Sequence, residues 1–190
     1  GQGLENGVTQ GFGDFATNSV FIWPQRTSMP YKGFDRGRFY NFRDGDVEAI
    51  RQQIHDIEYL APRIQGGGFR SGDNVVRGER TGAYSVYGDY PEFFMIDPVD
   101  IAEGRFINEL DLKNTRKVVV IGQRVYEELF DKDEECMGEY IEIQGIYFKV
   151  IGRFKSKKSG EQGNNENQAL FMPFTTMQRA YNYGDRLGWF

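Results

Sequence analysis

The chain of 190 residues is poor in the two side chains that most often build metal and redox sites, since it contains one cysteine and one histidine. The single cysteine, Cys136, excludes an internal disulfide and any zinc site built on paired cysteines. The single histidine, His55, excludes most metal sites and every catalytic triad that needs a second imidazole. We interpret His55 as a solvated or half-buried residue of a helix.

Long apolar runs and blocks of basic residues are also missing. No stretch approaches the roughly 18–20 consecutive apolar residues that cross a bilayer, and no charged start followed by an apolar run marks a signal peptide. The sequence as given is therefore expected to be a soluble piece. This expectation is compatible with a domain taken from a membrane protein. The net charge is −5 with the signs interspersed. Nucleic acid is therefore not expected as a partner.

Large aromatic side chains are abundant, at 15% of the residues. Such rings favour the half-buried surfaces of sheets, so a helical bundle is disfavoured. Predicted strands and helices follow one another without strict alternation. The expected fold class is therefore α+β rather than a doubly wound parallel sheet.

The clearest helix is predicted over residues 44–57, with Asn41 or Asp44 as its cap, because apolar residues recur there at spacings of three and four. This apolar stripe consists of Val47, Ile50, Ile54 and Ile57. A strand is predicted over 18–26, followed by a connecting loop over 27–41. A hairpin is predicted within 75–87, turning at Thr81-Gly82, and a single helical turn at 90–92.

The second half has stronger local patterns. Residues 118–130 form a predicted strand, turn and helix, and the alternation over 140–152 predicts a hairpin that turns at Gln144-Gly145. A solvated loop is predicted over 155–168, and a strand over 170–172 that ends at Pro173. Residues 175–178 have the spacing of a capping box before a short helix.

The motifs that could carry chemistry are weak. The acidic run 131–135 lacks the EF-hand order and is interpreted as a helix end or surface turn. The glycine-rich stretch 66–72 lacks the Lys-Ser/Thr pair of a phosphate-binding loop and is interpreted as a connector. The acidic residues beside Cys136 should raise the pKa of its thiol. No catalytic, cofactor-binding or metal-binding residue is predicted.

Several phrases occur in a fixed order over nearly the whole chain. Those of the first half are Asp46–Ile50, Tyr59–Pro62, Val86–Gly88, Tyr90–Phe93 and Glu103–Ile107. Those of the second half are Lys117–Gly122, Gly138–Ile143, Phe148–Gly152 and Phe171–Thr176. In this order they resemble the MacB-like periplasmic core domain, which lies between the first two membrane helices of FtsX-like ABC-transporter permeases. The sequences of residues 30–33 and 173–176 are most similar to those of Bacteroidetes-type permeases.

This resemblance implies a porter-like α/β subdomain over 1–85 and 165–190, truncated at its C-terminal end, with an inserted β-rich, Sabre-like subdomain over 86–164. It implies a non-catalytic periplasmic domain of an inner-membrane protein, coupling ATP-driven motion to export or to substrate and partner handling. The implied partners are the membrane-spanning part of its own permease, an ABC ATPase subunit, a second permease copy or a paralogue, and in many members a periplasmic adaptor. The family pattern continues past Phe190, so residues 187–190 are expected to begin a strand with an exposed edge.

Two other functions remain open. A stand-alone extracellular module that binds glycans or peptides fits the many aromatic residues. A hydrolase is also open, because paired carboxylates meet only in three dimensions. Within the matched phrases, Gly104 is expected to form a turn and Arg105 a charge-assisted hydrogen bond. The glycines at segment ends are expected to turn or to take positive φ. They are Gly88, Gly104, Gly122, Gly138 and Gly152.

Overall fold

The computed structural model describes residues 19–22, 28, 41–67, 72–182, 184 and 186–187. Its strands are β1 (Phe42–Arg43), β2 (Arg63–Gly67), β3 (Val75–Arg77), β4 (Arg80–Gly82), β5 (Ser85–Asp89), β6 (Asp100–Gly104), β7 (Val118–Gly122), β8 (Tyr140–Ile143), β9 (Ile146–Lys155), β10 (Ala169–Pro173) and β11 (Arg186–Leu187). Its helices are α2 (Asp44–Gln53), α3 (Phe93–Ile96), α4 (Glu109–Lys113), α5 (Gln123–Leu129), α6 (Gly160–Asn167) and α7 (Phe174–Ala180). The fold class is α+β, as predicted. Every helix in these ranges is too short or too polar to cross a bilayer.

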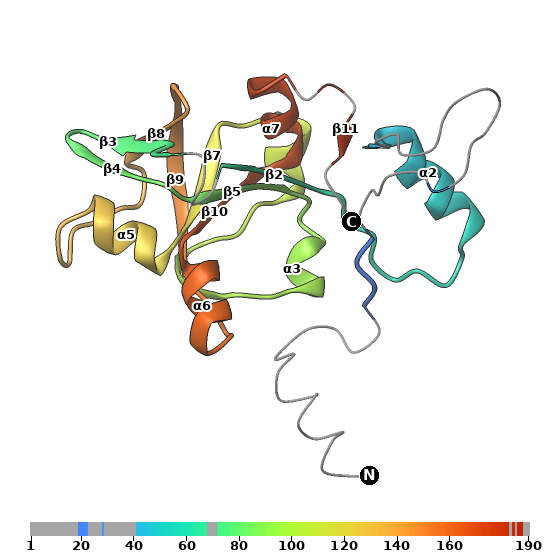
Figure 1. The fold of residues 1–190 in the computed structure, drawn as a ribbon, viewed down its shortest axis with the longest axis horizontal. Coiled ribbons are helices and arrows are strands. Elements are labelled where there is room, and N and C mark those ends of the chain that lie inside the picture. Colours follow the sequence, from blue (N-terminus) through green and yellow to red (C-terminus); the bar gives the residue numbers. More distant parts are fainter. Residues whose placement is uncertain are drawn as a thin grey trace, which may run out of the picture.

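A mixed sheet of nine strands forms the centre of the described part. Its order is β2-β5-β10-β7-β9-β8-β3-β4, and β6 pairs with the C-terminal half of β9. Strand β10 is parallel to β5 and antiparallel to β7, and β7 is parallel to β9. The remaining pairs in this sheet are antiparallel. Figure 1 shows α2 and the separate β1–β11 pair beside this sheet, at the end opposite β3 and β4.

Both faces of the central strands are buried. On β10, Leu170 and Met172 belong to one apolar cluster, whereas Phe171 belongs to another. Strand β7 divides in the same way, because successive residues of a strand point to opposite faces. The larger cluster also takes side chains from α5 and α7, and the smaller one contains the stacked rings of Phe154 and Phe171, with centroids 4.7 Å apart. Burial on both faces explains why β7 and β10 are continuous apolar runs.

Several local predictions are confirmed. The strand, turn and helix expected over 118–130 are β7 and α5, and the hairpin expected over 140–152 is β8 and β9. The turn lies at Gln144 and Gly145, where φ is +46° and +85°. The strand that ends at Pro173 is β10. The helical turn after Tyr90 is also present, since the N–H of Phe93 donates to the Tyr90 carbonyl at 3.0 Å.

The helix predicted over 44–57 is shorter than expected. It ends at Gln53, and Ile54 has extended backbone with φ −118° and ψ 103°. Ile54 is 51% exposed and is therefore not part of a buried stripe. Neither Asn41 nor Asp44 is the cap. Arg43 has that position, and its N–H donates to the Asp46 carboxylate at 2.8 Å.

The loop predicted over 155–168 contains helix α6. A partly buried polar network stands where a solvated loop was expected, since Lys158 Nζ donates to Asp97 at 2.9 Å and to Glu166 at 2.7 Å. The early hairpin turns at Gly78 and Glu79 instead of Thr81-Gly82. Of the strand predicted over 18–26, residues 19–22 are described and have no regular structure, and the loop over 27–41 lies almost entirely outside the described residues.

The capping box predicted at 175–178 is wrong. Helix α7 begins one residue earlier, at Phe174. The hydroxyl of Thr175 donates to the Leu112 carbonyl at 2.6 Å, and that of Thr176 to the Arg116 carbonyl at 2.7 Å. These side chains therefore join α7 to the α4 region instead of capping their own helix.

The division into porter-like and Sabre-like subdomains stays a prediction. Strands from both sides of its boundaries at 85/86 and 164/165 share the central sheet, because β10 lies between β5 and β7. The pair β1–β11 and helix α2 lie outside that sheet.

Candidate functional site

A hollow of about 660 Å³ lies between α4 and α7. Its walls combine apolar, hydroxyl, amide and charged side chains. They are Glu109, Leu112, Lys113, Thr115, Thr175, Gln178, Arg179, Asn182 and Gly184. The hydrogen bond from Thr175 to the Leu112 carbonyl joins two of these wall residues. The two helices around the hollow are therefore held in place relative to each other.

Helix α4 ends in a strained turn at this hollow. Thr115 has φ of +50°. Its N–H donates to the Leu112 carbonyl at 3.2 Å, and the N–H of Arg116 donates to the Asp111 carbonyl at 3.0 Å. These are the two hydrogen bonds of a Schellman motif, whose left-handed position is usually glycine. A β-branched residue is rare at positive φ because its side chain crowds the backbone.

The carboxylate of Asp111 joins three segments behind this turn. Arg105 donates to it at 2.6 and 3.1 Å, Arg116 donates at 3.2 Å, and the Asn108 N–H donates at 3.0 Å. Burial alone would raise the pKa of Asp111, but the hydrogen bonds and the positive charges outweigh it and hold the pKa below its usual range. The charge-assisted bond predicted for Arg105 is therefore confirmed, and Gly104 turns the chain before it with φ of +74°.

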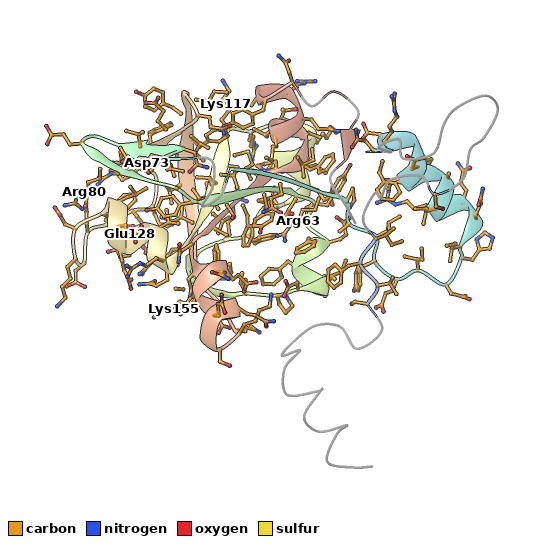
Figure 2. All side chains as sticks on the ribbon, in the orientation of Figure 1. Arg63, Asp73, Arg80, Lys117, Glu128 and Lys155 are labelled. Atoms are coloured by element: carbon orange, nitrogen blue, oxygen red, sulfur yellow. The ribbon has the colours of Figure 1, made fainter. Side chains whose placement is uncertain are left out.

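A second ion pair lies inside the molecule, and no sequence pattern indicated it. Arg63 in β2 donates twice to Asp89 in β5, at 2.5 and 2.8 Å. The guanidinium also lies over the rings of Tyr87 and Phe93, at 4.0 and 3.7 Å from their centroids. Figure 2 shows Arg63 on the side of the sheet that faces α3. Burial raises the pKa of Asp89 despite this partner. A buried Arg and Asp on separate strands leave no local signature.

The acidic run 131–135 lies beside a second hollow, of about 510 Å³. Two of its carboxylates pair with the β3–β4 hairpin: Asp131 with Arg80, and Glu134 with Arg77 at 2.6 Å. Among the described residues no group of three or more histidine, cysteine or acidic side chains could hold a metal ion. The run forms a surface turn, as predicted.

The other residues that the sequence singled out are not among the residues that line either hollow. His55 is exposed, in a turn after α2 rather than within a helix. Cys136 is fully buried, and burial, with a smaller effect from Glu103, raises the pKa of its thiol to about 11. Gly66 and Gly67 are part of β2, while residues 68–71 lie outside the described residues. The charged clusters therefore hold elements together.

The glycines at segment ends have two different roles. Gly104 and Gly138 have positive φ, of +74° and +81°. Gly88, Gly122 and Gly152 do not, and are glycine because another segment lies too close for a side chain. A Cβ on Gly122 would lie 2.3 Å from the Asn167 carbonyl oxygen, and one on Gly152 would lie 2.3 Å from that of Arg105.

Comparison with known proteins places this arrangement in a family. Residues 1–188 match the family model described as the MacB-like periplasmic core domain. The macrolide export ATP-binding/permease protein MacB of Syntrophobacter fumaroxidans is 27% identical over 179 residues, which cover 94% of this chain and 24% of that protein. The uncharacterized ABC transporter permease YvrN of Bacillus subtilis is 41% identical over 91 residues, which cover 46% of this chain and 22% of that protein. The matched region thus spans about a quarter of the length of each of these relatives.

Two solved structures have the same fold. The periplasmic region of MacB from Actinobacillus actinomycetemcomitans superposes with a TM-score of 0.71 at 19% identity, covering 92% of this chain and 73% of that one. The extracellular domain of the transporter YknZ from Gram-positive bacteria superposes with a TM-score of 0.67 at 13% identity, covering 90% and 81%. The family match over nearly the whole chain agrees with both structures, and the protein therefore belongs to the MacB-like periplasmic core domain family, as a periplasmic domain of a MacB-like ABC-transporter permease.

Proposed function

We propose that this domain catalyses no reaction and couples ATP-driven motion to export, or to the handling of substrates and partners, on the periplasmic side. Its proposed partners are the membrane-spanning part of its own permease, an ABC ATPase subunit, a second permease copy or a paralogue, and a periplasmic adaptor. Nucleic acid is excluded from this proposal because the net charge is −5. The relatives named for macrolide export include an ATP-binding part, which supports an ATPase partner.

The observation that carries this proposal is the pairing of β1 with β11. Phe42 lies opposite Leu187, and Arg43 lies opposite Arg186, in an antiparallel pair. Two segments from distant parts of the sequence therefore run side by side, next to α2 and outside the central sheet. In the proposed coupling, movement of either flanking membrane helix acts on this one place in the domain.

A joint connects this pair and α2 to the sheet. Gln178 of α7 donates to the carboxylate of Asp44 in α2 at 3.1 Å. Val47 is buried in the larger apolar cluster, and Ile50 and Leu60 pack against it. We propose that motion reaches the sheet through these contacts.

The test uses the full-length transporter with Asp44→Cys and Gln178→Cys joined by a short bismaleimide. Cys136 can remain, because burial raises the pKa of its thiol to about 11 and slows its reaction. The control joins Arg80→Cys to Asp131→Cys, a surface ion pair at the far end of the sheet. Cross-linking at the joint should lower the rate of ATP hydrolysis several-fold, and the control should leave it unchanged. Equal rates in both cross-linked transporters would refute coupling through this joint.

A further inference from the structure

We propose that the hollow between α4 and α7 binds a small ligand that carries a carboxylate or phosphate group together with a short apolar part. Its volume of about 660 Å³ lies within the roughly 300–1,000 Å³ of small-molecule sites. Leu112, 9% exposed, supplies an apolar surface in the wall. This inference is independent of the proposed coupling, because it concerns binding to the domain alone.

Two cations converge on the hollow. Lys113 lies in the last turn of α4 and Arg179 in the last turn of α7, and both are exposed. In the ranges that the structure describes, neither side chain makes an ion pair or a hydrogen bond. Each cation alone could be explained by the negative C-terminal end of its helix. Helix ends alone do not explain why both cations line the same hollow. Binding of an anionic group between Lys113 and Arg179 would explain it.

The hollow also contains a carboxylate that tunes its charge. Glu109 lies in the wall. Partial desolvation, and then the neighbouring Glu92, raise the pKa of Glu109. A carboxylate in this place repels an anion, and the three charged side chains of the wall, Glu109, Lys113 and Arg179, together carry one net positive charge. The site therefore favours a single anionic group over a polyanion.

The backbone of the wall is held in an unusual conformation. Thr115 and Asn182, neither of which is glycine, line the hollow and have φ of +50° and +56°. Non-glycine residues at positive φ cost free energy, and such strain gathers at binding sites. At Thr115 a glycine would remove the strain but would also remove the hydroxyl from the wall.

The test titrates the 190-residue chain with octanoate and with octyl phosphate, followed by amide chemical shifts and by calorimetry. A dissociation constant on the order of 0.1–1 mM is expected for at least one of them, with shifts centred on Thr115 and Asn182. Acetate and inorganic phosphate test the anionic group alone, and octyl glucoside tests the apolar part alone. All three should bind at least about tenfold more weakly, equivalent to about 1.4 kcal/mol.

Variants then separate charge from shape. Lys113→Gln with Arg179→Gln should weaken octanoate or octyl phosphate binding at least about tenfold, which is about 1.4 kcal/mol. Lys155→Gln, an exposed lysine on another side of the molecule in Figure 2, should leave binding unchanged. Glu109→Gln should strengthen binding, because it removes the repelling charge.

Three results would overturn the proposal. The first is unchanged affinity in the Lys113→Gln, Arg179→Gln double variant while circular dichroism shows it folded. The second is equal binding of inorganic phosphate and octyl phosphate, or of octyl glucoside and octanoate. The third is a set of shifts that maps away from α4 and α7. If the double variant does not fold, the Glu109→Gln variant alone tests the proposal. An affinity for octanoate or octyl phosphate that does not increase in this variant refutes the proposal.

Discussion

Replacing Asp111 by asparagine should lower the free energy of unfolding by about 3 kcal/mol. The carboxylate is fully buried, while its partners Arg105 and Arg116 are 43% and 44% exposed. A hydrogen bond to a charged group contributes about 1.5–3 kcal/mol, and the amide of asparagine can replace only one acceptor oxygen. Both arginines can turn toward water in the variant, which keeps the loss below the sum of all the bonds.

The loss can be measured by urea unfolding followed by far-UV circular dichroism. For a domain of this size each kcal/mol corresponds to about 2–4 °C, so the melting temperature should fall by about 6–12 °C. Asp131→Asn is the matched control, because Asp131 is 75% exposed and pairs with Arg80 at the surface. That change should cost less than about 1 kcal/mol. Equal losses in the two variants would refute the structural role assigned to Asp111.

A further prediction concerns how pH changes the stability difference between the original protein and Asp111→Asn. The pKa of Asp111 is lower in the folded protein than in the unfolded chain, where it is near 3.9. The stabilisation is therefore fully present above the unfolded pKa and is lost as the pH falls through the folded pKa. The stability difference between the original protein and Asp111→Asn should shrink below about pH 4. A difference that stays constant down to pH 2 would contradict this assignment of the pKa.

Two further predictions concern the backbone. Thr115→Gly should raise the free energy of unfolding by about 0.5–1 kcal/mol, because Thr115 has φ of +50°. Asn114→Gly should lower the free energy of unfolding by a similar amount, because Asn114 has φ of −90°. Thermal unfolding of both variants tests the sign of each change. Gly122→Ala should lower the free energy of unfolding by about 1–3 kcal/mol, since the new Cβ would lie 2.3 Å from the Asn167 oxygen. Gly45→Ala in α2 should be neutral or stabilising, because a Cβ there would have nothing within 4 Å. Equal effects of the two alanine substitutions would show that the contact at Gly122 relaxes freely.

The elements that could be predicted from the sequence are those whose pattern is local. The alternation over 140–152 and the apolar runs of β7 and β10 predict strands because the reason for burial lies within the segment. Strand β2 lacks such a pattern. It contains Arg63 and two glycines, and Arg63 can be buried only because Asp89, Tyr87 and Phe93 surround its guanidinium.

Helix α6 was missed for a related physical reason. Two glycines and three asparagines among its eight residues lower its helix propensity. The nearby contacts of Lys158 with Asp97 and Glu166 stabilise the segment, and Asp97 comes from a distant part of the chain. The α4–α7 hollow was equally hidden, because Lys113 and Arg179 meet only when α7 packs beside α4. Arg105 was the exception, since its partner Asp111 lies nearby in the sequence.

The position of β10 has a consequence for how the protein folds. Residues 169–173 lie between β5 and β7, so two groups of strands stay unconnected until this late segment has been synthesised. The edges of β5 and β7 are then open, and open apolar edges pair readily with other chains. Joining strands so far apart in sequence closes long loops, which slows folding. Strand β10 should therefore be the last part of the sheet to become protected from hydrogen exchange during refolding, and the state that precedes its insertion should be the one most prone to aggregate.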